Sequence, residues 1–552
     1  MSLTQVYREL DRDIVLFDFR IHSRERYEEE LFVPTPSIKE EILAEFEALV
    51  TRVKELEAPD PVYVIVKSHM QDYLDGMRAG VEGMFKNPAN RLLHCSWGFS
   101  NYIRTDSRPE EERMRLFRLK AENIKKMWEI VRPLMADLDQ KDLNGWADGC
   151  SSVIQDLKYV QEDTGFGFSE EAAKEAAAIL GEVITWFEAW QKDVCGNLIT
   201  GELEKTDEIP DDVKTVKLPE EEYRRILHDE LGVELDELLD WGVNELEKTR
   251  SEALDIAAKI DVPDPKPTNM GEVNDMLWKY AGPCDTPEEL FRRVEVYLKR
   301  TRALAHEFVW LPEDEQCVCV TVPSELRISY PWGGYEDCDG RMRPLRGQMF
   351  LNQYNYKEIT DGWIKMNCMH ETYPGHHVQY IRAITDHIPH TMKLGAKYIP
   401  LLEGTAHRTE RAFEFIYGED PFFPLFVAYR RHHTAVRIKA DLMLRYYGNT
   451  IEEVTQLYMK ELGFAHDIAR GQVEAHIYMN AVYFTCYYYG MKKLCDWEKE
   501  YGYSKKDYTE ELFSVGNISL ENFKRYLDLS PADKKRFKSE FASLLMDTEE
   551  VF

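Results

Sequence analysis

Apolar residues recur at every third or fourth position along most of the chain, and this spacing predicts a mainly helical protein. One such stripe is formed by Ile38, Ile42, Phe46, Leu49 and Val53. Ser37 and Glu40 are typical of a capping box at its start, and the segments 286–289 (TPEE) and 450–453 (TIEE) indicate further helix starts. The acidic stretch 218–260 also has helical spacing, with a charged face toward solvent.

Strand character is rare and is concentrated shortly before residue 370. Residues 317–322 alternate β-branched and small side chains, and residues 348–354 (QMFLNQY) form a second plausible strand. A loop rich in glycine and proline, 330–347, lies between them. We therefore expect a small sheet inside an otherwise helical protein.

Three prolines within residues 261–267 interrupt the helical pattern and favour an extended connection. We place a division there, between an N-terminal helical lobe over 1–262 and a C-terminal lobe over 268–552 that carries the candidate chemistry. One integral domain is the alternative, because 552 residues also suit a single large two-lobed body. The expected fold class is mainly α.

The charge balance narrows the classes of partner. The chain has 69 basic and 100 acidic residues, a formal net charge of −31. Such a surface repels phosphate backbones and anionic lipid headgroups, so we expect neither a nucleic acid nor a membrane partner. The composition does not indicate an oligomeric state.

The expected location is the cytoplasm. The first twenty residues are interrupted by charges and do not resemble a signal peptide, and no segment has the eighteen or so apolar residues of a membrane span. Ten scattered cysteines also lack the dense pattern of a secreted disulfide domain.

Residues 370–377 read H-E-T-Y-P-G-H-H and contain the densest group of imidazoles in the chain. A glutamate directly after the first histidine is typical of the zinc-peptidase motif H-E-x-x-H, in which the second histidine follows one helical turn later. Here Pro374 occupies that position. A kink at Pro374-Gly375 would bring His376 beside His370, whereas His377 on a regular helix would lie about 10.5 Å along the axis. His376 is therefore the expected second ligand, and His377 the fallback.

A third ligand is expected downstream, in the segment L-L-E-G-T-A-H-R-T-E-R at 401–411. Gluzincin peptidases take their third ligand from a glutamate on a following helix, and Glu403 lies 27 residues beyond His376. The small residues Gly404 and Ala406 would allow that helix to approach the motif closely. Taken alone, Glu403 could equally be a capping or solvated carboxylate.

Two strings carry a resemblance to a known family. HETYPGHHVQ (370–379) resembles the HExxPGHxxQ signature of the domain-of-unknown-function family 885, and LLEGTAHRTE (401–410) is similar to that family's EGWALYAE-like segment. Shorter similarities at 221–227, 437–441 and 487–490 extend the resemblance over most of the chain.

The resemblance implies a gluzincin-like metallopeptidase, related to the thermostable carboxypeptidases and to oligopeptidases such as neurolysin. It implies a large two-lobed helical metallopeptidase-like fold with a small antiparallel β-sheet beside the metal helix. The chain differs from the family pattern at 405–408 (TAHR) and around Asp441 and His476. The resemblance therefore carries no substrate specificity.

One zinc ion is the expected cofactor, with other divalent transition metals as alternatives. His370, His376 and Glu403 would fill three positions and leave the fourth for water, as in catalytic zinc sites. Glu371 is the expected general base that takes a proton from this water and passes it to the leaving amine.

Three further residues are candidates for contacts with the substrate. The phenol of Tyr487 or of a neighbour in the aromatic run 483–489, or the imidazole of His476, would donate to the developing oxyanion. Arg437 would clamp a substrate carboxylate, or would simply pair with Asp441 one helical turn away. In the aromatic run 483–489, packing is the alternative role for Tyr487.

The expected function is a zinc-dependent hydrolase of peptide bonds in oligopeptides. Two alternatives remain open: a hydrolase of a non-peptide amide metabolite, and a non-catalytic binding protein that uses the metal for stability. Glu371 distinguishes a catalytic site from a structural one, because a structural metal needs no proton acceptor beside its ligand.

Overall fold

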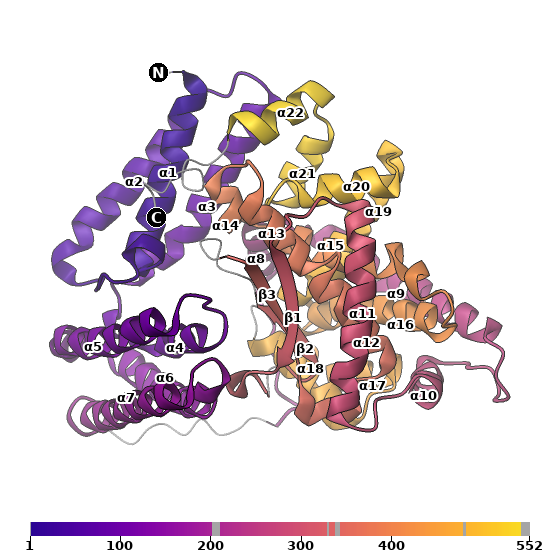
Figure 1. Ribbon diagram of the computed structural model, residues 1–552, viewed down its shortest axis with the longest axis horizontal. Coiled ribbons are helices and arrows are strands. Elements are labelled where there is room, and N and C mark those ends of the chain that lie inside the picture. The colour runs from indigo at the N-terminus through magenta and orange to yellow at the C-terminus, as the bar shows by residue number, and fades with distance from the viewer. Residues whose placement is uncertain (1, 201–209, 328–329, 337–342, 479–481, 542–552) are drawn as a thin grey trace.

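The computed structural model describes residues 2–200, 210–327, 330–336, 343–478 and 482–541. Helices dominate these residues, so the expected mainly α fold class is confirmed (Figure 1). Before the proline-rich segment 261–267 the helices are α1 (Leu3–His22), α2 (Lys39–Glu55), α3 (Pro61–Gly83), α4 (Cys95–Arg104), α5 (Glu110–Leu134), α6 (Gln140–Glu162), α7 (Glu170–Asn197), α8 (Glu220–Ile226) and α9 (Leu235–Lys259).

The helices after this segment surround the motif at residue 370. They are α10 (Met270–Tyr280), α11 (Pro287–Phe308), α12 (Asp361–Asn367), α13 (His376–Thr385), α14 (His390–Leu394), α15 (Ile399–Ala412), α16 (Phe422–Asp441), α17 (Ile451–Leu462), α18 (His466–Tyr478), α19 (Cys486–Tyr501), α20 (Lys505–Phe513), α21 (Leu520–Leu527) and α22 (Pro531–Glu540). Within the described residues, no helix is long and apolar enough to span a bilayer.

Two of the three predicted helix starts have the expected caps. The side chain of Thr286 accepts a hydrogen bond from the backbone N–H of Glu289, and Thr450 and Glu453 form a complete capping box. The capping box predicted at Ser37 is wrong. A short 3₁₀ turn over Pro36–Ile38 precedes α2, so α2 begins at Lys39 without a side-chain cap.

The sheet has three strands, in the order β1 (Glu315–Thr321), β3 (Leu345–Leu351) and β2 (Gly333–Glu336). β1 pairs with β3 in parallel and β2 pairs with β3 antiparallel, so the expectation of a purely antiparallel sheet is wrong. Parallel neighbours need a crossover of a dozen or more residues, and the range 322–344 between β1 and β3, which includes β2, is long enough for one. β2 lies inside the segment that we interpreted as a loop, because its two glycines hide the strand pattern.

The buried apolar residues form two large cores. The smaller core lies mostly on α4 to α7, which sit together at the lower left of Figure 1. The larger core combines α1 to α3 with α9 and with most helices of the second half. α9 packs closely on α16, and a Cβ at Gly242 would lie 2.8 Å from Leu442. The segment 261–267 therefore does not separate two cores, because helices on either side of it share one.

Candidate metal centre

The chain around residue 370 breaks its helix in three steps. α12 continues into a π-helical turn over Cys368–Thr372, the backbone then becomes extended at Tyr373, and a cis peptide bond joins Tyr373 to Pro374. α13 starts at His376. Gly375 fits this break because a Cβ there would lie 1.9 Å from the carbonyl oxygen of His370. The break brings the rings of His370 and His376 to 4.8 Å between their centroids.

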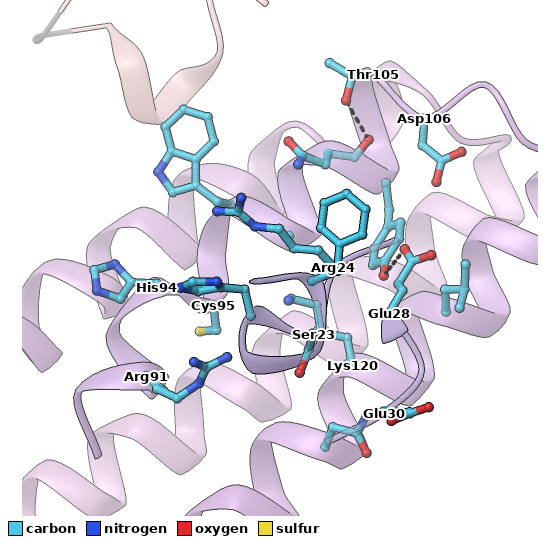
Figure 2. Close-up of a pocket in the computed structure, with 18 of the residues that line it drawn as sticks. Ser23, Arg24, Glu28, Glu30, Arg91, His94, Cys95, Thr105, Asp106 and Lys120 are labelled. Carbon is cyan, nitrogen blue, oxygen red and sulfur yellow. Dashed lines mark hydrogen bonds between the residues drawn. The ribbon is translucent and has the colours of Figure 1, made fainter. Parts of the chain in front are cut away.

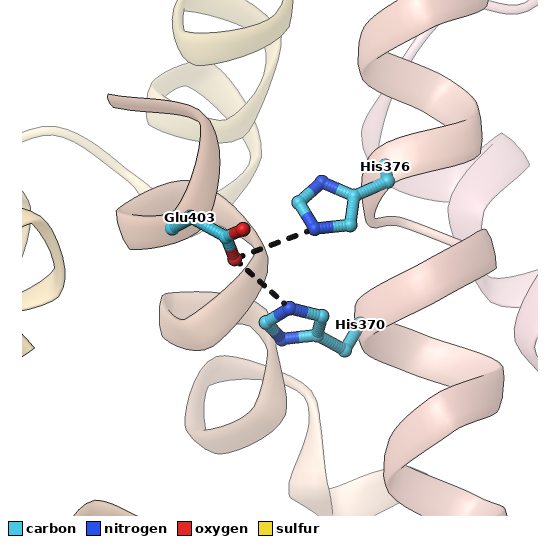
Figure 3. Close-up of side chains that lie close together, drawn as sticks. All are labelled: His370, His376 and Glu403. Carbon is cyan, nitrogen blue, oxygen red and sulfur yellow. Dashed lines mark ion pairs between the residues drawn. The ribbon is translucent and has the colours of Figure 1, made fainter. Parts of the chain in front are cut away.

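Glu403 reaches toward both rings from the neighbouring helix α15 (Figure 3). Its Oε2 lies 3.3 Å from Nε2 of His370 and 3.5 Å from Nε2 of His376, and the three ligand atoms all lie within 4.8 Å of one another. Ligand atoms bound to one tetrahedral zinc at about 2.0–2.1 Å are about 3.3 Å apart. The spacing therefore suits a single ion with little movement.

The outer atoms of the three side chains are held by hydrogen bonds. Nδ1 of His370 lies 2.8 Å from Oε1 of Glu410, and Nδ1 of His376 lies 2.8 Å from Oε1 of Gln379. Tyr483 donates to Oε1 of Glu403. Each ring therefore turns its Nε2 to the centre, while Oε2 of Glu403 is buried there without a hydrogen bond. This arrangement is the usual support of metal-binding histidines.

The charges of the centre are strongly coupled. Burial works against charge on Glu403, but the imidazoles of His376 and His370 lower its pKa well below the usual value. Burial likewise works against a charged His370, but the carboxylates of Glu403 and Glu410 outweigh it and raise its pKa to about 10. A proton on His370 thus balances the carboxylates when metal is absent, and a divalent cation can replace it.

Close packing of α15 on α19 sets the position of Glu403. A Cβ at Gly404 would lie 2.5 Å from the backbone of Gly490, and a Cβ at Gly490 would lie 1.8 Å from the carbonyl oxygen of Pro400. The two helices can therefore approach only because both positions are glycine. The same contact brings Tyr487, on α19, near the ring of His370, with 6.2 Å between their centroids.

Glu371 follows His370 in the π-helical turn and is partly exposed, whereas His370 and Glu403 are buried. Among the described residues no group forms a hydrogen bond or an ion pair with its carboxylate. Tyr330 lies close by. Burial and the charges of Glu371 and Glu403 raise the pKa of its phenol. An accessible carboxylate without a partner is therefore present beside the three ligand candidates.

The structure places Arg437 against the aromatic residues near the centre. Its guanidinium carbon lies 4.6 Å from the ring centroid of Phe484 and 5.0 Å from that of Tyr487. Within the described part of the chain this buried guanidinium has no hydrogen bond and no carboxylate partner, so it does not pair with Asp441. Burial and the nearby Arg430 lower its pKa. An unpaired buried cation favours an anionic group of a ligand.

Two of the predicted residues do not face the centre. Nε2 of His377 lies 2.7 Å from Oε2 of Glu315 on β1, and its Nδ1 lies 2.9 Å from the hydroxyl of Tyr335. The fallback ligand is therefore already engaged in the sheet.

His476, the candidate oxyanion donor, is buried with Asp441 and Tyr458. Nδ1 of His476 lies 3.2 Å from Oδ1 of Asp441, and its Nε2 lies 2.7 Å from the hydroxyl of Tyr458. Both ring nitrogens are thus occupied, and no N–H of His476 is left for a substrate.

Sequence reasoning missed three residues around the centre: Glu410 and Gln379, which hold the histidine rings, and Tyr330. Tyr483 belongs to the aromatic run expected to supply a phenol, but its hydroxyl donates to Glu403. Gln379 lies inside the string HETYPGHHVQ and Glu410 closes LLEGTAHRTE, so both strings contain the signal. Glu410 follows Glu403 at i+7, which places both carboxylates on one face of α15.

A family described as "Bacterial protein of unknown function (DUF885)" matches residues 28–524, so the chain belongs to this family. No curated protein matches the chain significantly.

Two solved structures are similar to the chain over nearly its whole length. One is "the putative lipoprotein from Colwellia psychrerythraea", with a TM-score of 0.66 and 14% sequence identity over 95% of this chain and 98% of that one. The other is "a putative lipoprotein of unknown function from Shewanella oneidensis", with a TM-score of 0.65 and 16% identity over 96% of this chain and 100% of that one. At such identities the similarity shows a shared fold alone.

Proposed function

We propose that this protein is a zinc-dependent hydrolase of peptide bonds in oligopeptides. His370, His376 and Glu403 would hold the ion, and Glu371 would act as the general base. The observation that carries the proposal is the spacing of the three buried ligand atoms, together with the unpartnered carboxylate of Glu371 beside them.

The donor set fits zinc and its neighbours among the divalent transition metals. Two imidazole nitrogens and one carboxylate oxygen are the ligands of catalytic gluzincin-type sites, and they leave an open coordination position. Zinc bound there would supply a Lewis acid and lower the pKa of a bound water to about 7. Oε2 of Glu403, buried without a hydrogen bond, is the atom most in need of such a cation.

Side chains around the ion would carry out proton transfer, oxyanion stabilisation and substrate binding. Glu371 would take a proton from the attacking water and return it to the leaving amine. Burial and Glu403 raise the pKa of Tyr487 well above its usual value, so its phenol stays protonated. Its O–H donates to the hydroxyl of Tyr483 at 3.1 Å, and it would have to turn from that hydroxyl to donate to an oxyanion. The unpaired guanidinium of Arg437 would hold a substrate carboxylate.

His407 and Arg408, where the chain departs from the family pattern, contact other side chains of the protein. His407 lies 3.0 Å from Oε2 of Glu410 and 2.9 Å from the hydroxyl of Thr434, and the buried Arg408 pairs with Glu498. These side chains are thus engaged within the protein. No contact of theirs favours a non-peptide amide, so we retain the peptide as the substrate class.

The cellular location is a separate question. We keep the cytoplasm as the prediction from the sequence, and the cell envelope as the alternative to which the names of the two solved relatives point. Fractionation of cells that express the full gene, followed by immunodetection, distinguishes the two locations.

A peptide library tests the proposed function. The metal-loaded protein and a matched metal-free sample are incubated with a mixture of oligopeptides, and the products are identified by mass spectrometry. We expect cleavage by the metal-loaded sample alone. If a sample with a full complement of bound zinc cleaves no peptide, the peptidase proposal is wrong and the non-catalytic alternative is favoured.

A further inference from the structure

A large cavity lies between the smaller core and the metal-binding half of the molecule. Its volume is about 1120 Å³, and it is lined by residues of α4 and α5 and by residues of β2, α13 and α14. Pockets for small ligands usually measure about 300–1,000 Å³. The cavity is therefore large enough for several residues of an extended peptide.

One wall of this cavity leads to the candidate metal centre. Tyr335, Tyr380 and Ile384 line the cavity, and the last two follow His376 on α13 at i+4 and i+8. These positions share one face of a helix. The hydroxyl of Tyr335 also lies 2.9 Å from Nδ1 of His377, the residue after His376. The cavity wall thus comes within one helical turn of a ligand candidate.

The cavity is also lined by three cations without a carboxylate partner: Arg24, Arg91 and Lys120 (Figure 2). Within the described part of the chain none of them forms an ion pair. Arg91 donates only to the carbonyl oxygen of Ile21, at 2.7 Å, and Lys120 lies over the ring of Phe99. Gly98 makes room for this lysine, because a Cβ there would lie 2.3 Å from Lys120 Nζ.

Among the described residues, no acidic side chain of the cavity forms an ion pair with these three cations. Arg108 is paired with both Glu28 and Asp106, at 2.8 Å and 2.5 Å. Glu336 on β2 also lines the cavity, and its carboxylate is 4.0 Å from Arg104. Glu30 is exposed and has no ion pair among the described residues.

The charges of neighbouring cations in this cavity act on one another. Burial, followed by the charge of Arg24, lowers the pKa of Arg91 to about 10. Burial also lowers the pKa of Lys120; the nearby Cys95 and Glu28 oppose this effect, and the charge of Arg91 adds to it. A group of unpaired cations costs free energy unless an anion binds to it. The group is positively charged although the whole chain has a net charge of −31.

We propose that this cavity binds acidic side chains of the peptide substrate, with Arg91, Lys120 and Arg24 as the anion-binding residues. The inference rests on the proposed function for its substrate class, a peptide. It adds that the preferred peptides carry aspartate or glutamate some residues away from the bond that is cut. A protein of strongly negative charge would otherwise repel such peptides, and the cation cluster overcomes this locally.

A binding experiment without catalysis tests the inference. Two fluorescein-labelled hexapeptides are compared by fluorescence anisotropy on metal-free protein: one contains aspartates, and the other has asparagine in their place. We expect the acidic peptide to bind at least about tenfold more tightly, which is the usual strength of one hydrogen bond to a charged group. Its affinity should fall with increasing salt, whereas that of the asparagine peptide should not.

Two substitutions locate the binding site. The substitutions Lys120→Met and Arg91→Met keep the apolar stem of the side chain and remove its charge. Each should lower the affinity for the acidic peptide about tenfold and leave the affinity for the asparagine peptide unchanged. Lys126→Met is the matched control, because Lys126 is an exposed residue of the same helix, paired with Glu122 at 3.7 Å, and should change neither affinity.

Equal affinities of the two peptides for the wild-type protein would overturn the inference, whether or not the variants fold. So would an unchanged affinity for the acidic peptide in both folded variants. If the metal-loaded enzyme cleaves neutral peptides as fast as acidic ones, this inference fails and the hydrolase stands. If acidic peptides bind as expected but are never cleaved, the proposed hydrolase fails and the binding site stands.

Discussion

Nδ1 of His370 lies 2.8 Å from Oε1 of Glu410. This contact holds the ring so that Nε2 faces Glu403, and it makes Nδ1 the protonated nitrogen when His370 is neutral. The carboxylate therefore presets both the orientation and the tautomer that a metal ligand needs. Glu410 is fully buried, so few other groups can take over this task.

Removal of the charge at Glu410 should weaken the metal site. We expect Glu410→Gln to lower the affinity for zinc by about 10- to 100-fold, measured by competition with a chromophoric chelator. Glu414→Gln is the control, because Glu414 lies just after the end of α15 and its carboxylate contacts Arg411 at 3.6 Å. Equal zinc affinities of wild type and Glu410→Gln would show that this contact does not support the site.

Two adjacent histidines should differ sharply in their effect on metal binding. His376→Asn removes a ligand and should abolish stoichiometric zinc, whereas His377→Asn removes the contact to Glu315 and should retain the metal. Elemental analysis of the two purified proteins measures this difference. Loss of zinc in His377→Asn with retention in His376→Asn would reverse the assignment.

The break in the helix before α13 should form without strain only if residue 375 is glycine. Because a Cβ there would meet the carbonyl oxygens of His370 and Met369 at 1.9 Å and 2.2 Å, we expect Gly375→Ala to cost about 3 kcal/mol or more of unfolding free energy. Gly145→Ala is the control: Gly145 lies inside α6 with open space around it, and alanine should stabilise that helix by about 0.5–1 kcal/mol. Urea unfolding gives both values, and equal stabilities of the two variants would contradict this account of the break.

The hydrogen bonds around Glu315 predict a pH dependence of stability. Burial disfavours the charged form, but contacts with His377, Tyr373 and Arg302 lower the pKa of the buried Glu315 carboxyl to about 2, below the ordinary 4.5. The pKa of Glu315 is lower in the folded protein than in the unfolded chain. Its contribution to the free energy of unfolding is therefore complete above pH 4.5 and is lost as the pH falls toward 2.

The comparison with Glu315→Gln isolates this effect. In metal-free protein, the difference in unfolding free energy between wild type and the variant should be about 3 kcal/mol at neutral pH. It should shrink steadily between pH 4.5 and pH 2, in urea titrations at several pH values. A difference that does not change over this range would show that the charged form of Glu315 is not preferentially stabilised.

Local sequence signals account for much of the fold and for the grouping of His370, His376 and Glu403. Helical spacing and the caps at Thr286 and Thr450 depend on neighbours within one or two turns, so they can be read without tertiary contacts. The position of His376 also has a local cause, because proline and glycine at 374–375 exclude a regular helix.

Features that depend on distant contacts could not be predicted in the same way. The orientation of β1 relative to β3 depends on how the chain crosses over between them, which the strand residues do not encode. His476 and His377 are both plausible ligands or donors by type, but Asp441 and Glu315 occupy them from elements far away in sequence. The three cations of the cavity come from three separate segments, and only the folded chain brings them together.

The most direct test of the proposed function compares zinc content and peptide cleavage in wild type and Glu371→Gln. The variant keeps the three ligand candidates, so we predict one zinc per chain in both proteins. We also predict a loss of at least about 100-fold in the cleavage rate of the variant, because it lacks the proton acceptor. Cleavage by Glu371→Gln at the wild-type rate would contradict the role of Glu371, and absence of any divalent transition metal from the reconstituted wild type would contradict the metal site itself.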